Sequence, residues 1–308
     1  MLRMTEGGSV ALVTDLGVLA QIEAVFAQAR VAGFLHARDL ATGAEIGWEP
    51  DTPVVSASTF KVPVLVELFR QSDAGNIDLT EQVTMPVDGR APGPTGASVM
   101  LDPVTLSWRD LALWMIVVSD NAATDVICER LGLDNINRTM VQLGLVATYL
   151  ETDCRGIFKT LMEDAGVNDI ENVPMAPPPE LLAKYRAVRP EDTDRTTPRD
   201  MTRLLELIYT DQAASPEACE HMRRILHSQV WPHRFASGFP EDDVRTGGKT
   251  GTIITWRNEV GVATYADGVR YAVATFTRSH EARAKHPAAD AAIGAAARLA
   301  VDALREGR

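Results

Sequence analysis

Apolar residues recur along this chain at two spacings: every three to four residues, which predicts helices, and every second residue, which predicts strands. The first helical pattern covers Val18–Ala29, and Gly33 follows it as the expected stop. The alanine-rich segment Ala288–Leu304 predicts a closing helix. Four more helical patterns lie between them, at Lys61–Leu68, Leu106–Val118, Ala122–Leu131 and Met201–Tyr209. The middle of the chain is therefore predicted to be mainly helical.

Strand patterns lie near both ends of the chain, in pairs around turn sequences. Thr42-Gly43 lies between the first two strands, and Asp267-Gly268, a strong hairpin signal, lies between the last two. The strands are predicted at Phe34–Asp39, Glu45–Trp48, Ile253–Tyr265 and Val269–Arg278. Because terminal helices and strands must bury their apolar faces on each other, we predict an α+β fold. One antiparallel sheet is built from both chain ends, with flanking helices and an inserted all-helical lobe.

We expect a single domain over residues 1–308 with two lobes. Residues 15–55 and 215–308 are assigned to the α/β lobe and residues 56–214 to the all-helical lobe, with a cleft where the lobes meet. Val167–Arg195 carries five prolines among charged residues. This composition predicts an irregular excursion rather than a domain linker.

The net charge limits the partners that this chain can bind. It is −12, from 42 acidic and 30 basic side chains, and nucleic acid or an anionic membrane would need clustered Lys and Arg. A small-molecule partner is expected instead. The apolar stretch Val10–Val13 is too short for an export signal, and no run approaches the roughly 18 apolar residues of a membrane span. The chain as written is expected to be cytoplasmic, or secreted if a leader has been removed.

Cysteine and histidine spacing predicts neither a disulfide scaffold nor a metal site. Cys128, Cys154 and Cys219 are far apart and odd in number, so we interpret them as reduced structural thiols. The six histidines contain no HExxH or similar ligand spacing. No metal or cofactor is predicted.

The first of three short motifs is Ser58-Thr59-Phe60-Lys61, directly before a helical pattern. A serine at a helix N-terminus lies in the positive end of the helix dipole, and a lysine one turn later lies on the same face, where it can take or relay the hydroxyl proton. The alternative is an N-capping serine followed by a solvated lysine.

The second motif, Ser119-Asp120-Asn121, lies between two predicted helices. Ser119 could pass a proton to a leaving nitrogen, and the Asn121 amide could hold a substrate amide. The alternative is a helix cap, since Ser, Asp and Asn are preferred between helices.

The third motif, Lys249-Thr250-Gly251, follows Gly247-Gly248 and precedes a predicted strand. A cation, a hydroxyl and a glycine on an exposed strand edge can bind a carboxylate, and the edge can pair with a peptide-like substrate. The alternative is a glycine-rich turn.

Together, in this order and in these contexts, the three motifs resemble the signature of class A β-lactamases and penicillin-binding proteins, which are penicillin-recognising serine hydrolases. The resemblance runs from about Leu16 to the end of the chain. Less specific support comes from Gly96–Met100, Asn121–Asp125 and Arg195–Met201. The resemblance implies a β-lactamase/transpeptidase-like fold and a Ser58 acyl-enzyme.

The resemblance also implies roles for individual residues. Ser58 Oγ would attack the acyl carbon with Lys61 as general base or relay, and the backbone N–H groups of Ser58 and Thr252 would form the oxyanion hole. Ser119, tuned by Lys249, would protonate the departing nitrogen. The residues that would bind the substrate are Asn121, Thr250, Gly251 and Thr252. Lys249, Thr250 and Thr252 would meet the substrate carboxylate. Arg257, taken to lie on the same strand, either adds a second cation there or is a surface residue.

The chain departs from class A β-lactamases where a glutamate activates water for deacylation. In that family the glutamate lies in a loop downstream of the second motif. The same spacing along this chain, counted without gaps, leads to Cys154 or Arg155, where no carboxylate stands. Glu151 and Asp153 are the nearest candidates, and Glu163 and Asp164 lie further on, but solvated loop acids are the alternative for each. We therefore expect ready acylation and slow deacylation.

Three functions follow from these motifs. The first is a serine hydrolase of the β-lactamase type that hydrolyses β-lactams or is acylated by them. The second is a D-alanyl peptidase or an esterase of the same fold. The third is a penicillin-binding sensor that is acylated once. Repeated turnover of an activated ester, against a single stoichiometric burst, would separate an enzyme from a sensor.

Overall fold

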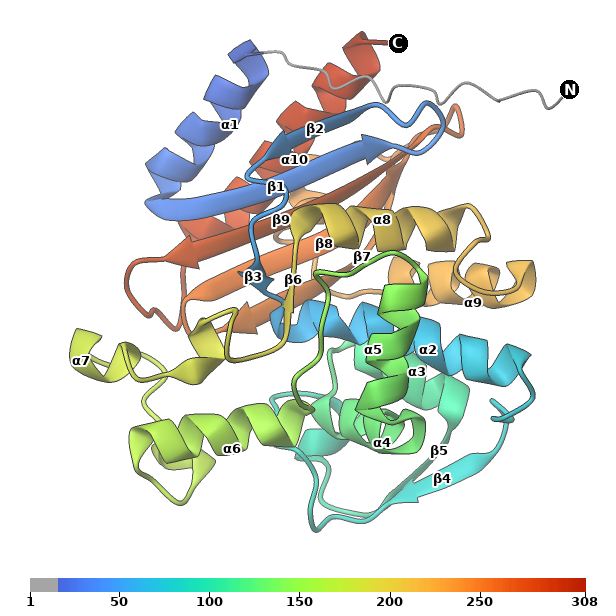
Figure 1. Cartoon of the computed structure of the whole chain (residues 1–308), viewed down its shortest axis with the longest axis vertical. Helices are drawn as coiled ribbons and strands as arrows, with labels where there is room; N and C mark the ends of the chain where they lie inside the picture. The colour runs from blue at the N-terminus through green and yellow to red at the C-terminus, as the bar shows by residue number, and fades with distance from the viewer. Residues whose placement is uncertain (1–15) are drawn as a thin grey trace, which may run out of the picture.

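The computed structural model describes residues 16–308 and contains one five-stranded antiparallel sheet in the order β2-β1-β9-β8-β7 (Figure 1). The first two strands of the chain pair with the last three, which confirms the predicted sheet built from both chain ends. The β7 strand forms one edge of this sheet. The strands are β1 (Val31–Asp39), β2 (Glu45–Trp48), β7 (Arg245–Ile253), β8 (Trp256–Thr264) and β9 (Arg270–Ser279).

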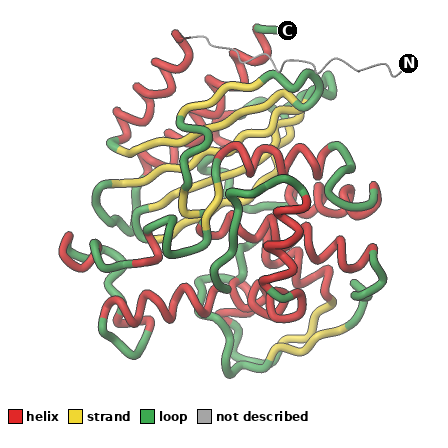
Figure 2. The backbone as a smooth tube through the Cα atoms, viewed as in Figure 1, coloured by secondary structure: helices red, strands yellow, loops and turns green. Residues whose placement is uncertain are grey.

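The two terminal helices, α1 (Leu16–Ala29) and α10 (Pro287–Glu306), cover one face of the sheet (Figures 1 and 2). Ile22 and Phe26 of α1 belong to a buried apolar cluster with Leu35 of β1 and Val273 of β9. The face of α10 toward this cluster is rich in alanine, so helix and sheet pack closely.

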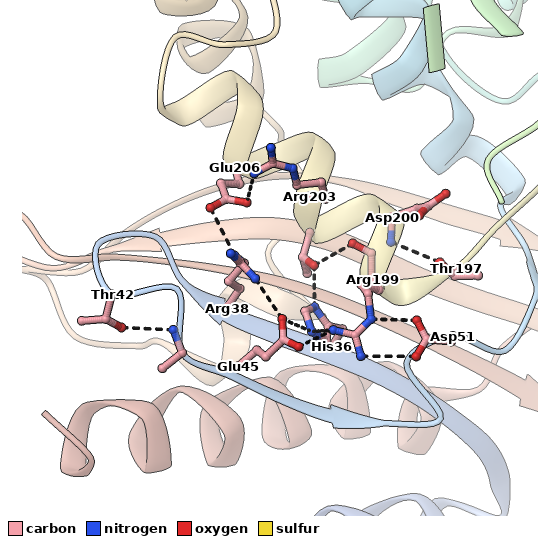
Figure 3. A network of polar contacts seen from close by, with 12 residues as sticks. His36, Arg38, Thr42, Glu45, Asp51, Thr197, Arg199, Asp200, Arg203 and Glu206 are labelled. Atoms are coloured by element: carbon pink, nitrogen blue, oxygen red, sulfur yellow. Dashed lines mark hydrogen bonds and ion pairs between the residues drawn. The ribbon is translucent and has the colours of Figure 1, made fainter. Parts of the chain in front are cut away.

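Helices α8 (Pro198–Tyr209) and α9 (Pro216–His227) lie on the other side of the sheet. Buried side chains of α8 join Val260 and Ala274 in the larger apolar cluster. Polar contacts also attach α8 to the β1-β2 hairpin (Figure 3). Arg38 of β1 pairs with Glu206 of α8 at 3.1 Å, and the buried His36 hydrogen-bonds Thr202 of α8. Although α8 falls inside the residues assigned to the helical lobe, it packs on the sheet.

The rest of the middle segment forms helices around α2 (Lys61–Asp73). Its residues from Lys61 to Phe69 are all buried, which makes α2 the centre of this lobe. The surrounding helices are α3 (Trp108–Val117), α4 (Asn121–Leu131), α5 (Leu133–Gln142), α6 (Cys154–Ala165) and α7 (Pro179–Leu182). Two short antiparallel pairs accompany them: β4 (Gln82–Met85) with β5 (Val104–Ser107), and β3 (Val54–Val55) with β6 (Arg195–Thr196).

Single-turn helices complete the fold, and no helix between residues 16 and 308 is both long and apolar enough to cross a membrane. The short helices are η1 (Ala57–Phe60), η2 (Gly96–Val99), η3 (Ile170–Asn172), η4 (Arg186–Val188) and η5 (Phe235–Gly238). The proline-rich stretch predicted to be irregular contains η3, α7 and η4.

The predicted starts of one helix and one strand are wrong. The third helix begins at Trp108 rather than Leu106, because Ser107 ends β5 and its hydroxyl caps α3 by accepting from Asp110 N. Ile253 ends β7 instead of starting a strand, and β8 begins at Trp256 after a turn at Ile254. The Lys249-Thr250-Gly251 motif thus lies inside a strand.

Gly33, the predicted helix stop, is also misassigned. It lies within β1, where a Cβ would come 2.1 Å from the ring of Phe26, so glycine is required for close packing with α1. The chain leaves α1 through Arg30, whose φ is +55°.

Candidate active site

Ser58 lies in η1, one turn before the start of α2, where the sequence predicted a helix N-terminus. The preceding segment is fixed to the rest of the protein by Ser56, whose N–H and hydroxyl both donate to the carbonyl of Asp194 at 3.0 Å. Ala57 has a φ of +44°, a conformation that L-residues rarely adopt. The backbone before Ser58 is therefore held in a sharp, strained turn.

Lys61 is fully buried, so the alternative of a solvated lysine is wrong. Its Nζ donates to Ser119 O at 2.8 Å, to Asn121 Oδ1 at 2.8 Å and to Ser119 Oγ at 3.2 Å. Burial lowers the pKa of this ammonium. The first motif is thus joined to the second by a lysine that gives up its proton more readily than an exposed one.

The Ser119-Asp120-Asn121 segment connects α3 to α4. Asp120 stabilises the fold, whereas Ser119 and Asn121 line the cavity. Asp120 is buried and caps α4, accepting from Ala122 N at 2.9 Å and from Ala97 N at 2.7 Å. This middle residue therefore has the capping role given above as the alternative. Ser119 has a φ of +59°, and its hydroxyl lies beside Lys61 Nζ.

The third motif lies on the edge strand β7 and runs close to the segment from Ser56 to Ser58. A Cβ at Gly251 would come 2.9 Å from Ser56 O and 3.2 Å from Ser58 N, so only glycine permits this approach. Asn258, paired with Gly251 on β8, ties the two segments together, because its Nδ2 donates to Val55 O and Ser56 O.

The N–H groups of alternate β7 residues point away from β8 at this free edge. Thr250 N donates outward to Gln229 Oε1 at 2.7 Å. Two residues further on, Thr252 N points to the same side of the strand by the same alternation, and Thr252 lines the cavity. This is the orientation that an oxyanion-hole donor needs.

Lys249 is fully buried and its Nζ donates to Thr250 O at 2.9 Å. Its pKa is lowered well below the ordinary range by burial and by the nearby Lys61. Glu259 is the acid that most favours the charged form of Lys249, and burial raises the pKa of Glu259 to about 7. The two lysines of the motifs thus share a buried, electrostatically coupled environment.

A cavity of about 580 Å³ joins the three motifs. Ser58, Ser119 and Asn121 line it from the helical side, and Thr250 and Thr252 line it from β7. The predicted cleft between sheet and helices therefore contains at least one member of every motif.

Arg257 does not line this cavity and lies on β8 rather than on the strand of the third motif. It is buried and pairs with Asp290 of α10 at 3.2 Å. The cation at the site is instead Arg234, which lines the cavity, donates to Thr252 Oγ1 at 2.7 Å and shares Asp290 with Arg257. The sequence gives no signal for Arg234, because this residue belongs to no motif and reaches the site only through the packing of η5.

Comparison with known proteins identifies the family. The profile of the β-lactamase enzyme family matches residues 18–304. This chain belongs to that family.

Several relatives of this β-lactamase-family protein span nearly its whole length. The β-lactamase regulatory protein BlaB of Streptomyces cacaoi is 28% identical over 306 residues, which cover 94% of this chain and 98% of that protein. A β-lactamase structure from Sphaerobacter thermophilus is 27% identical with a TM-score of 0.75, covering 94% and 96% of the two chains. A mutant of PBP-A, solved as an acyl-enzyme complex with penicillin G, has a TM-score of 0.76 at 22% identity, covering 97% and 99%. The chain has the β-lactamase/transpeptidase-like fold.

In this β-lactamase-family protein the candidate deacylation acids lie away from the cavity. Glu151 is exposed, and Asp153 caps α6 by accepting from Gly156 N at 2.8 Å. The more distant Glu163 and Asp164 both pair with Arg186. Among the residues that line the cavity, from Ala57 to Ile253, there is no Asp or Glu.

Cys154 occupies the cavity wall where the spacing predicted an acid. Its Sγ lies 3.5 Å from Asn121 Oδ1, and burial raises the pKa of the thiol, so it is neutral. Asp125 fixes this residue from behind, accepting from Cys154 N at 2.8 Å. All three cysteines are free thiols, as predicted.

The arrangement supplies a hydroxyl, two buried amines and backbone donors, which is the chemistry of acyl transfer. Between residues 16 and 308, no group of three or more His, Cys, Asp or Glu side chains is arranged to hold a metal ion.

Proposed function

We propose that penicillin-like β-lactams acylate Ser58 and that the resulting ester is hydrolysed slowly. The observation that carries this proposal is the convergence of Ser58, Ser119, Asn121 and Thr250 in one cavity, with Lys61 Nζ hydrogen-bonded to both Ser119 and Asn121. Family membership supports the same chemistry.

In the proposed acylation step Ser58 Oγ bonds to the lactam carbonyl carbon and the C–N bond of the ring breaks. Lys61, in the neutral form that its lowered pKa favours, takes the Ser58 proton. Ser119 Oγ passes its own proton to the departing nitrogen and receives one in turn from Lys61 Nζ, which lies 3.2 Å away. The N–H groups of Ser58 and Thr252 stabilise the oxyanion. Donors of this kind typically contribute about 2.7 to 4 kcal/mol to the barrier.

The substrate carboxylate is proposed to bind at the β7 end of the cavity. Thr250 and Thr252 supply hydroxyls there, and Arg234, rather than Arg257, supplies a cation. Lys249 lies behind Thr250, and its Nζ is held by Thr250 O.

Slow deacylation follows from the composition of the cavity wall. Hydrolysis of the ester needs a base to activate water, and the residue beside Asn121 is the neutral thiol of Cys154. No carboxylate lines the cavity from Ala57 to Ile253.

The test is intact-protein mass spectrometry after brief incubation with penicillin G, in wild type and Ser58→Ala. We expect an adduct of the full penicillin mass that forms only in the wild type and persists after free penicillin is removed. An adduct that disappears quickly with release of hydrolysed product would overturn slow deacylation. Absence of any adduct would favour a D-alanyl peptidase or an esterase.

A sensor that is acylated once is a second candidate, favoured by the similarity to the regulatory protein BlaB. Hydrolysis of an activated ester separates the two functions. A sensor gives one equivalent of product per protein, whereas a slow hydrolase continues to release product after the burst.

A further inference from the structure

A second cavity, of about 360 Å³, lies where the end of α1 and the end of β9 meet the start of α10. The residues that line it are all different from those that line the candidate active site. We call it the α10 pocket and define it by six of its lining residues: Arg30, Ser279, Glu281, Arg283, His286 and Ala288. Its volume falls within the range of about 300 to 1,000 Å³ that is typical of small-molecule sites.

His286 supplies a buried hydrogen-bond donor to the α10 pocket. The residue is 9% exposed, and its Nδ1 accepts from Ala289 N at 3.1 Å as the N-cap of α10. A ring nitrogen that accepts carries no proton, so the proton of the neutral imidazole is on Nε2. Between residues 16 and 308, Nε2 has no hydrogen-bond partner. Because buried donors in proteins are almost always satisfied, this one indicates a ligand in the pocket that His286 lines.

The backbone at the start of α10 offers a second donor beside this ring. Pro287 has no N–H, and Ala289 N is occupied by the cap, so Ala288 N is the first free donor of a 20-residue helix. Ala288 lines the pocket. The positive end of the helix dipole favours an anion at this position.

Two arginines line the same pocket, although the chain as a whole has a net charge of −12. Arg283 pairs with Glu281 at 3.0 Å. Arg30, directly after α1, is exposed and forms no ion pair within the part of the chain that the structure describes, so its charge is uncompensated. A guanidinium binds phosphate oxygens through two parallel hydrogen bonds. The pocket therefore attracts an oxyanion.

We propose that the α10 pocket binds a phosphate group, either as inorganic phosphate or as the phosphate monoester of a small metabolite. A tetrahedral dianion has enough oxygens to accept from His286 Nε2, Ala288 N and the Arg30 guanidinium at the same time, whereas a carboxylate has only two. The site is independent of the proposed acylation of Ser58, because the two cavities have no lining residue in common.

The experiment follows the backbone amide signals of the ¹⁵N-labelled protein by NMR during titration with inorganic phosphate, at an ionic strength kept constant with NaCl. The amides of residues 279–290 should shift together and reach saturation with one dissociation constant. The amides of Thr250 and Thr252 report separately on phosphate bound near Arg234 in the other cavity.

A titration with glycerol 3-phosphate distinguishes the two sources of the phosphate group. Tighter binding than that of inorganic phosphate assigns the pocket to a monoester, since its volume then holds the alcohol part as well. Equal or weaker binding assigns the pocket to inorganic phosphate.

His286→Asn removes the ring donor and keeps α10 capped, because asparagine is among the preferred N-cap residues. We expect phosphate to bind about tenfold or more weakly, since hydrogen bonds to charged groups are the stronger kind. Thermal unfolding should stay near that of the wild type. Arg30→Gln, at an exposed position, should weaken binding severalfold. Arg109→Gln is the matched control: this arginine is also exposed but lies outside the pocket, so the variant should retain the wild-type affinity.

Saturable shifts at residues 279–290 that both pocket variants weaken and Arg109→Gln does not would support the site. Shifts confined to Thr250 and Thr252, or no shifts at all, would overturn it. Wild-type affinity in both His286→Asn and Arg30→Gln would overturn the assignment to this pocket. Sodium acetate that produced the same shifts at the same concentrations would show general attraction to positive charge and overturn the recognition of phosphate.

Discussion

The thiol of Cys154 lies in the cavity wall beside the residues that would surround an ester at Ser58. Replacing it with glutamate adds a base next to Asn121, and the cavity of about 580 Å³ offers room for the longer side chain. A positioned general base typically contributes about a hundredfold or more to a hydrolytic step. We expect Cys154→Glu to shorten the lifetime of the penicillin adduct by at least about tenfold, measured by mass spectrometry after removal of free penicillin.

Cys154→Gln is the matched control for that prediction, because it has nearly the same size as the glutamate and cannot accept the proton. It should keep the long-lived adduct of the wild type. Equal lifetimes in the two variants would mean that size or packing at this position, and not a missing base, sets the rate of deacylation.

Asp194 is a buried carboxyl whose pKa is raised from 3.8 to about 7 by burial. Its Oδ1 accepts from Glu151 N and Thr152 N, while Oδ2 has no hydrogen-bond partner in the described part of the chain. The folded state therefore binds a proton that the unfolded state releases near pH 4. This contribution to stability is complete below that pH and is lost as the pH rises toward 7.

Stability measured by urea unfolding between pH 5 and 7 should reflect this titration. We expect the wild type to lose up to about 1 kcal/mol per pH unit through Asp194, and Asp194→Asn to show a smaller slope, whatever its absolute stability. Asp88→Asn, which removes an exposed carboxylate, should retain the wild-type slope. A slope unchanged in Asp194→Asn would show that this carboxyl is already ionised at pH 5.

At the scale of elements, the segment between β4 and β5 forms a wall of the cavity without regular structure of its own apart from η2. Pro92, Gly93, Pro94 and Thr95 of this segment line the cavity. The Arg90 guanidinium organises it by donating to five carbonyls: Met85, Pro86, Ala97, Met100 and Asp102, at 2.7 to 2.9 Å. The Arg90 side chain thus supplies the hydrogen bonds that carbonyls in a helix or strand receive from backbone N–H groups.

Arg90→Ala should loosen this wall and slow acylation, because all five carbonyls lose their donor together. We expect faster amide hydrogen exchange over residues 86–103 and a several-fold lower acylation rate, with exchange in α2 unchanged. Arg130→Ala is the control, since Arg130 makes a single bond to Asn76 O. Unchanged exchange in Arg90→Ala would mean that the prolines alone hold the loop.

At the scale of the whole molecule, local periodicity was enough to predict the terminal helices, the helices α2, α3, α4 and α8, and the hairpins at both chain ends, but not α5 or α9. It failed at β7, because Gly247 and Gly248 are typical of turns, yet a Cβ at Gly248 would come 2.5 Å from Val260 O of the paired strand. The α6 helix was missed for a related reason: its start depends on the Asp153 cap and on Asp125 from α4.

The site was predictable to the extent that it resides in short motifs. Ser58, Lys61, Ser119 and Lys249 were identified from spacing and from a family resemblance. Arg234 was not, since its place at Thr252 results from the shared pairing with Asp290 of α10. Contacts between elements far apart in the chain leave no periodic pattern in the sequence.

One such long-range contact joins the two halves of the candidate active site. Asn258, on the central part of the sheet, donates through Nδ2 to Val55 O at 2.9 Å and Ser56 O at 3.2 Å, directly before Ser58. Asn258→Val removes both bonds and leaves two carbonyls without this donor. We expect a loss of about 1 to 3 kcal/mol in stability, measured by urea unfolding.

The acylation rate should fall by more than the loss of stability explains. A displaced segment before Ser58 would misalign Ser58 with the β7 edge. We expect Asn258→Val to acylate about tenfold or more slowly under conditions where the protein stays folded. Thr277→Val is the matched control: Thr277 is equally buried, and its hydroxyl donates to Arg257 O within the sheet. It should lose comparable stability and keep the wild-type acylation rate. If both variants slowed acylation in proportion to their loss of stability, Asn258 would be one more stabilising contact of the sheet and not the residue that positions Ser58.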